Sequence, residues 1–117
     1  MKTLFIVNEA PYGSEKFFNA LRLAMALQKD SLASEIRFFL MADAVVGALP
    51  AQGTPNGYYN IERMLKAVMG KGGVVRLCGT CCDARGLKEL ALIDGTGIST
   101  MAQLAAWTAD SDKVLVF

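Results

Sequence analysis

Val74-Val75-Arg76-Leu77-Cys78-Gly79-Thr80-Cys81-Cys82 passes from an apolar run directly into a cluster of cysteines. The first five residues are mostly apolar and include β-branched valines, and they predict a buried strand over Val74–Cys78. A loop and the beginning of a helix are expected after the strand. Parallel sheets place ligands at the carboxyl ends of their strands, so this junction is also where we expect the chemistry.

All 3 cysteines of the chain lie between Cys78 and Cys82. A thiol that meets backbone N–H groups at the beginning of a helix is favoured as the thiolate. An odd number of cysteines at this spacing does not fit a disulfide framework, which spreads an even set along the chain. The cluster therefore predicts sulfur chemistry in a reducing, cytoplasmic environment.

Length and composition exclude several classes of protein. The 117 residues predict a single domain over 1–117. A net charge of +1 gives no electrostatic argument for a nucleic acid or a membrane as partner. Histidine is absent, which removes Ser-His-Asp triads, Cys-His dyads and most zinc hydrolases. No nucleotide-binding glycine motif occurs, and histidine, the commonest metal ligand, is missing. We therefore expect no cofactor and no resident metal.

Strand-like and helix-like segments alternate along the chain. The apolar patterns predict strands at Thr3–Val7, Glu35–Met41, Val74–Cys78 and Val114–Phe117. They predict helices from Ser14 to about Gln28, over Ala44–Leu49, from Asn60 to the glycines after Val68, and after Thr100. Alternation of this kind predicts βαβ units, and therefore an α/β fold with a parallel sheet covered by helices on both faces.

Four polar residues stand where helices are expected to begin. Ser14, Asp43, Asn60 and Thr100 are each of a type that accepts a hydrogen bond from the first turn of a helix. Thr100 also has Gln103 three residues later, as in a capping box. We therefore interpret Asp43 and Asn60 as caps in preference to catalytic groups.

Several stretches distributed over nearly the whole chain match one known family. They are Ala10–Glu15, Asn19–Ala24, Phe39–Val45, Gly57–Ile61, Leu77–Cys81, Arg85–Gly86, Leu104–Thr108 and Asp112–Leu115. On these stretches the chain resembles the DsrE/DsrF-like family, and most closely its YchN-like branch. The resemblance implies a flavodoxin-like three-layer sandwich with a mostly parallel five-stranded sheet, assembled as a homotrimer or homohexamer.

The same resemblance implies a function. Relatives such as the DsrE and TusD subunits are persulfide carriers, and their sulfur-accepting cysteine corresponds to Cys78. We therefore expect a sulfur carrier or sulfurtransferase, in which Cys78 accepts sulfur from a donor protein and passes it to a thiol of an acceptor protein. Cys81 is the expected second thiol. Arg85 is expected to offset the negative charge of the thiolate or persulfide.

Other residues are candidates for binding the sulfur or its carrier. The backbone N–H groups of Gly79, Thr80 and the residues up to Cys82 could form an anion-binding turn. The side chain of Cys82 itself is better explained as a small apolar group in the core. The family pattern also places Asp43 and Asn60 near the site. Tyr12, Gly13 and Tyr59 lie in loops that could border it, or could equally serve as packed lids or subunit contacts.

Two other functions fit the cysteine cluster. Cys78 and Cys81 have the Cys-x-x-Cys spacing of dithiol oxidoreductases, although Gly79-Thr80 is not the usual thioredoxin insert. Alternatively, the chain could be a binding module for a small ligand or metal, in which three thiolates would need a fourth ligand such as Asp83.

Overall fold

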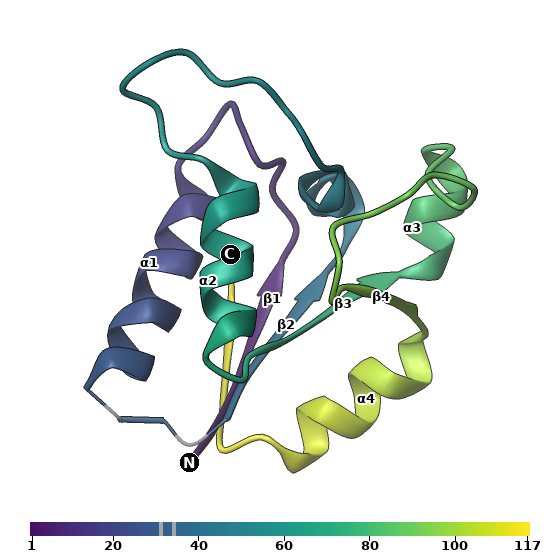
Figure 1. The fold of residues 1–117 in the computed structure, drawn as a ribbon. Helices are drawn as coiled ribbons and strands as arrows, with labels where there is room; N and C mark the ends of the chain where they lie inside the picture. Colours follow the sequence, from purple (N-terminus) through teal and green to yellow (C-terminus); the bar gives the residue numbers. More distant parts are fainter. Residues whose placement is uncertain (31, 34) are drawn as a thin grey trace.

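A computed structural model of the chain describes residues 1–30, 32–33 and 35–117. In this part of the chain five strands form one parallel sheet in the order β4-β3-β2-β1-β5 (Figure 1). The strands are β1 (Lys2–Val7), β2 (Glu35–Leu40), β3 (Val74–Cys78), β4 (Gly97–Ser99) and β5 (Lys113–Val116). The α/β class and the five-stranded sheet are confirmed, and every pairing is parallel.

Helices lie on both faces of this sheet, as expected for a three-layer sandwich (Figure 1). The helices are α1 (Lys16–Lys29), the short 3-10 helix η1 (Ala42–Ala48), α2 (Ile61–Gly70), α3 (Gly79–Ala84) and α4 (Met101–Asp110). Helices α1 and α2 pack side by side against one face, and α4 covers part of the other. None of the described helices is both long enough and apolar enough to cross a membrane.

Alternate residues of the central strands divide the core into two clusters. Phe5 and Phe38 point toward α1 and α2, and their rings stack with centroids 4.7 Å apart. Their neighbours Leu4 and Phe39 point to the opposite face, where they pack with Cys78 and Leu104. The second cluster is much the smaller, and α4 contributes Leu104 and Trp107 to it.

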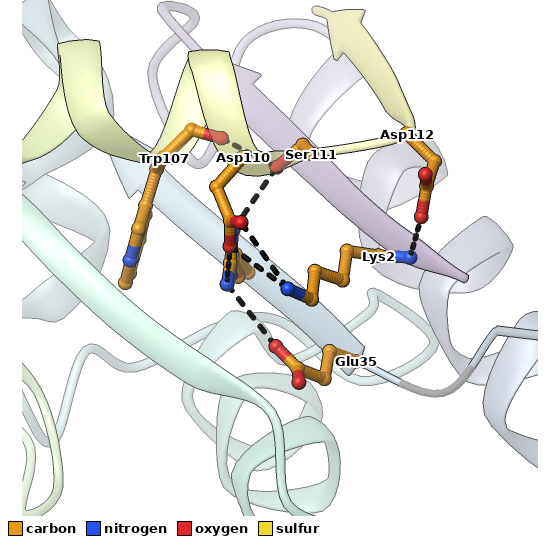
Figure 2. Close-up of polar contacts among 7 residues, drawn as sticks. Lys2, Glu35, Trp107, Asp110, Ser111 and Asp112 are labelled. Atoms are coloured by element: carbon orange, nitrogen blue, oxygen red, sulfur yellow. Dashed lines mark hydrogen bonds and ion pairs between the residues drawn. The ribbon is translucent and has the colours of Figure 1, made fainter.

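Polar contacts hold the C-terminal end of α4 on the sheet (Figure 2). The guanidinium of Arg37 lies 2.7 Å from Asp110 and 3.1 Å from Glu35, and it stacks over Trp107 at 5.6 Å. Lys2 pairs with the same carboxylate of Asp110 at 3.1 Å. These contacts connect β1, β2 and α4 at the end of the sheet opposite to the cysteines.

Two of the expected helix caps are wrong and two are confirmed. Helix α1 begins only at Lys16, because the flanking residue Glu15 makes no capping bond and Ser14 Oγ lies 3.4 Å from the Lys16 amide. Asp43 lies inside η1, where its carboxylate faces another partner. Asn60 accepts a hydrogen bond from the amide of Arg63, and Thr100 accepts one from the amide of Gln103.

The junction after β3 differs from the expected one. No loop separates strand from helix, since Cys78 ends β3 and Gly79 already begins α3. Strand β4 was not anticipated from the residue pattern. The remaining differences are shifts of one or two residues. Strand β1 begins at Lys2, β2 ends at Leu40 and the last strand is Lys113–Val116, while the helix expected over Ala44–Leu49 is the 3-10 helix Ala42–Ala48.

Candidate functional site

Cys78 occupies the carboxyl end of β3 and is also the N-cap of α3. Its Sγ accepts a hydrogen bond from the amide of Cys81 at 3.4 Å. The helix can begin at once because residue 79 is a glycine: a Cβ there would lie 3.0 Å from the carbonyl oxygen of Ser99 on β4. The local sequence therefore places a thiol at the carboxyl end of β3, with a backbone N–H donor directed at its sulfur atom.

A hollow of about 530 Å³ opens beside this thiol. One wall comes from the end of β3 and from α3, and the other from the end of β4 and the beginning of α4 (Figure 1). The lining residues are Cys78, Gly79, Thr80, Cys81, Asp83, Ser99, Thr100 and Met101. The hollow thus lies at the carboxyl edge of a parallel sheet, where sequence reasoning expected a site.

Cys78 and Cys81 both face the hollow, but their environments differ. Cys78 is only 8% exposed, whereas Cys81 is partly exposed. Burial raises the pKa of the Cys81 thiol, and its hydrogen bond to Cys78 raises it further. Both causes favour the protonated form of Cys81.

The Sγ of Cys81 also accepts a hydrogen bond, from the amide of Ala42 at 3.2 Å. Ala42 has a φ of 50°, in the left-handed region that costs an alanine about 1–2 kcal/mol. This conformation turns the first N–H of η1 toward the thiol. The bond opposes the effect of burial, because it lowers the pKa of Cys81. Sequence reasoning missed Ala42, since its contribution comes from the backbone alone.

Arg85 and Asp43 form an ion pair next to the thiols, outside the lining of the hollow. Nε and Nη2 of Arg85 lie 3.0 Å and 2.9 Å from one carboxylate oxygen of Asp43. Nη1 of Arg85 donates to the carbonyl oxygen of Cys81 at 3.1 Å. The pair connects η1 to α3, and the positive charge of Arg85 contributes a small lowering of the pKa of Cys81.

Cys82 points away from the hollow into the main core and is fully buried. Burial raises the pKa of its thiol, and the neighbouring sulfur of Cys78 raises it further. The third cysteine is therefore placed as a small apolar core residue.

The candidate tyrosines form a separate cluster. The ring of Tyr59 stacks on Tyr12 and on Phe18, with centroids 5.6 Å and 4.2 Å away. The hydroxyl of Tyr59 donates to the carbonyl of Ser14 at 3.0 Å, and the hydroxyl of Tyr12 accepts from the amide of Ile61 at 3.1 Å. These contacts fasten two loops to each other, and neither tyrosine lines the hollow beside the cysteines.

Gly13 and Asn60 also lie outside the cysteine hollow. Gly13 and Tyr59 line a different hollow of about 340 Å³. Asn60 caps α2 and borders a third hollow, of about 250 Å³. Of the candidates named from sequence, the structure thus gathers Cys78, Gly79, Thr80 and Cys81 at one place, with Arg85 and Asp43 behind them.

No group of three or more histidine, cysteine, aspartate or glutamate side chains placed to hold a metal ion occurs among the described residues. Cys82 points away from the other two cysteines, which leaves a pair of thiols.

The sequence model of the DsrE/DsrF-like family matches residues 1–117. The chain belongs to the DsrE/DsrF-like family. This family is associated in general with sulfur relay. Membership agrees with two thiols facing one hollow in a chain that has no histidine.

Several members of the family are similar over their whole length. Protein YchN of Escherichia coli strain K12 is 47% identical over 116 residues, which is 99% of this chain and 98% of that protein. Uncharacterized protein MJ0989 of Methanocaldococcus jannaschii is 40% identical over 117 residues, with 100% of both chains covered. The resemblance to the YchN-like branch is thereby confirmed.

Solved structures agree with the fold. The crystal structure of the E. coli ychN protein matches with a TM-score of 0.93 over 99% of this chain and 98% of that one. MTH1491 of Methanobacterium thermoautotrophicum, a protein of unknown function, matches with a TM-score of 0.79 over 99% of this chain and 98% of that one. At 13% identity, the second match bears on the fold alone.

Proposed function

We propose that this protein is a cytoplasmic persulfide carrier in which Cys78 accepts sulfur and a partner thiol receives it. The observation that carries the proposal is the Sγ of Cys78, which lines the hollow at the carboxyl end of β3 and accepts a hydrogen bond from the amide of Cys81 at 3.4 Å. A thiol in this position can be reached by a donor persulfide, and a backbone N–H is directed at its sulfur atom.

The proposed reaction is two exchanges at one sulfur atom. The thiolate of Cys78 attacks the outer sulfur of a donor persulfide, so that a new S–S bond forms to Cys78. The donor's own S–S bond breaks, and the donor leaves as a thiolate. A thiolate of the acceptor protein then attacks the outer sulfur on Cys78, which leaves as a thiolate in turn. Neither exchange needs an added oxidant or reductant.

The surroundings of the thiols support these steps. The hollow of about 530 Å³ gives room for the side chain that carries the incoming sulfur. Its lining contains a single ionisable group besides the thiols, the carboxylate of Asp83. Arg85 is engaged by Asp43 and by the carbonyl of Cys81, so its role is to fix α3 and to offset negative charge nearby.

Intact-mass measurement tests the proposal. The wild type and the Cys78→Ser, Cys81→Ser and Cys82→Ala variants are incubated with a cysteine desulfurase and cysteine, or with polysulfide. We expect the wild type to gain one sulfur atom that a reductant removes, and Cys78→Ser to gain none. A wild type without an adduct, with its accessible thiols freely alkylated, would contradict a carrier function.

A dithiol redox function is the second candidate, because Cys78 and Cys81 line the same hollow and the amide of Cys81 donates to the Sγ of Cys78. This function predicts a Cys78–Cys81 disulfide in oxidised protein and reduction of protein disulfides. Peptide mapping of the oxidised protein separates it from the carrier: without that disulfide the redox function is excluded.

Self-association is a further part of the proposal. Val114 and Val116 lie on the edge strand β5 and are 37% and 65% exposed, and Met101 at the mouth of the hollow is 60% exposed. Apolar side chains on an open sheet edge favour pairing with another copy. We propose a homotrimer or homohexamer, and a monomer in light scattering at micromolar concentration would contradict it.

A further inference from the structure

The hydrogen bonds around the two accessible thiols have a direction. The amide of Ala42 donates to Cys81 Sγ, and the amide of Cys81 donates to Cys78 Sγ. Burial raises the pKa of the Cys81 thiol, which keeps Cys81 protonated and leaves Cys78 as the first sulfur to attack. Sulfur should accordingly enter at Cys78.

The exposure of the two cysteines favours Cys81 as the residue from which sulfur leaves. Cys78 is only 8% exposed, whereas Cys81 is partly exposed. A thiol of a folded acceptor protein therefore reaches a sulfur atom carried on Cys81 more readily than one held on Cys78.

We propose that Cys81 is a second sulfur-carrying residue, to which the sulfur bound on Cys78 moves before it leaves the protein. This inference rests on the proposed carrier function and adds the direction of the transfer. It also gives the Cys-x-x-Cys spacing a role that requires no disulfide.

The internal step balances without any other reactant. The thiol of Cys81 first gives its proton to the outer sulfur on Cys78. The resulting Cys81 thiolate attacks that sulfur, so that a bond from Cys81 Sγ to the sulfur forms and the bond from Cys78 Sγ breaks. Cys78 leaves as a thiolate, and the persulfide is now on Cys81 with its proton.

Each anion in this exchange has its own hydrogen-bond donor. The departing Cys78 thiolate accepts a hydrogen bond from the amide of Cys81, 3.4 Å away. The attacking Cys81 thiolate accepts one from the amide of Ala42, 3.2 Å away, and the positive charge of Arg85 also favours it. Because a backbone amide donates to each of the two sulfur atoms, the two persulfide forms should have similar free energies, and sulfur should not be trapped on either residue.

The position of the sulfur over time tests the inference. Protein loaded with inorganic polysulfide in a Cys82→Ala background is quenched with iodoacetamide at successive times, digested, and sequenced by tandem mass spectrometry. We expect the extra sulfur on Cys78 first and on Cys81 later. Sulfur that never appears on Cys81 would overturn the second position while leaving the carrier function intact.

Delivery to two acceptors of different size completes the test. The loaded Cys81→Ser variant should transfer sulfur to a folded protein with one exposed thiol at least about tenfold more slowly than the wild type. It should still release thiocyanate to cyanide, which is small enough to reach Cys78, and this arm shows that the Cys78 site remains intact. Delivery to the protein thiol at the wild-type rate would overturn the inference. Failure of the carrier function itself looks different, because the wild type would then take up no sulfur.

Discussion

The amide nitrogen of Ala42 lies 3.2 Å from the Sγ of Cys81 and donates a hydrogen bond to it. The two residues are 39 positions apart in the chain, one at the beginning of η1 and the other in α3. The bond exists because Ala42 adopts a φ of 50°. A strained alanine therefore supplies the contact that opposes the effect of burial on the pKa of Cys81.

Replacement of Ala42 by valine should affect both stability and thiol reactivity. A β-branched side chain resists the left-handed conformation more than alanine does, so Ala42→Val should lower the free energy of unfolding by about 1–2 kcal/mol. Loss of the amide donor should also raise the pKa of Cys81 and slow its alkylation near pH 8. Urea denaturation and the rate of iodoacetamide labelling measure the two effects.

Ala51 offers a matched control, with a φ of 61° and an amide that donates to Glu62 at 2.7 Å. Ala51→Val should cost a similar amount of stability and leave the labelling of Cys81 unchanged. Equal labelling rates in both valine variants would show that the Ala42 amide does not influence the thiol.

Arg85→Gln should reduce the reactivity of Cys81. The positive charge of Arg85 lowers the pKa of Cys81, so its removal should shift the pH profile of alkylation upward. At a fixed pH near 8, the smaller thiolate fraction should appear as slower labelling of Cys81 by iodoacetamide. Lys88→Gln removes the same charge from an exposed neighbour that does not contact the thiols, and it should leave the profile in place. Superimposable profiles for the wild type and Arg85→Gln would refute this role.

Replacement of Cys82 by serine should destabilise the protein more than replacement by alanine. A hydroxyl without a partner at this fully buried position costs about 1–3 kcal/mol, whereas alanine leaves a small cavity that costs about 1 kcal/mol. Chemical denaturation should therefore rank the wild type above Cys82→Ala, and Cys82→Ala above Cys82→Ser. Since Cys82 does not line the hollow, both variants should load sulfur as the wild type does. Reduced loading by Cys82→Ala would show that this thiol takes part.

The central strands and the cysteine cluster could be predicted because their signals are local. Apolar runs define β1, β2 and β3, and the thiols follow β3 directly. Strand β4 has only three residues, Gly97-Ile98-Ser99, and its pairing with β3 depends on backbone contacts that leave little trace in composition. The wall that β4 and α4 contribute to the hollow was missed for this reason.

Tertiary packing decides which loops at the carboxyl edge meet the thiols. Tyr12 and Tyr59 do lie in loops, as expected, but stacking with Phe18 keeps them in a cluster of their own. Asp43 was interpreted as a cap because of its residue type, and the side chain instead binds Arg85 from another helix. Contacts over 42 positions of chain, like this one, cannot be recognised from a single sequence.

The ion pair between Arg37 and Asp110 should make the stability of the folded protein depend on pH in the acidic range. Hydrogen bonds from Arg37 and Lys2 lower the pKa of Asp110 in the folded protein (Figure 2). Its contribution is therefore complete above the pKa of the unfolded chain and is lost as the pH falls through the folded value. Asp110→Asn should lower Tm at pH 7, and the difference from the wild type should shrink toward pH 3. Asp94→Asn, at an exposed loop position, should match the wild type at both pH values.

Two glycines at the end of α2 should respond to alanine in opposite ways. A Cβ at Gly73 would lie 2.5 Å from Cγ1 and 2.7 Å from the carbonyl oxygen of Val68, so Gly73→Ala must displace backbone and should cost about 1–3 kcal/mol. A Cβ at Gly70 would meet nothing within 4 Å, and this residue is the last one in α2. Gly70→Ala should therefore raise the free energy of unfolding by about 0.5–1 kcal/mol. Because Gly73 immediately precedes β3, its substitution should also disturb the strand that carries Cys78, and sulfur loading should fall in Gly73→Ala but not in Gly70→Ala. Equal stability of the two variants would mean that α2 and β3 can separate enough to admit the methyl group.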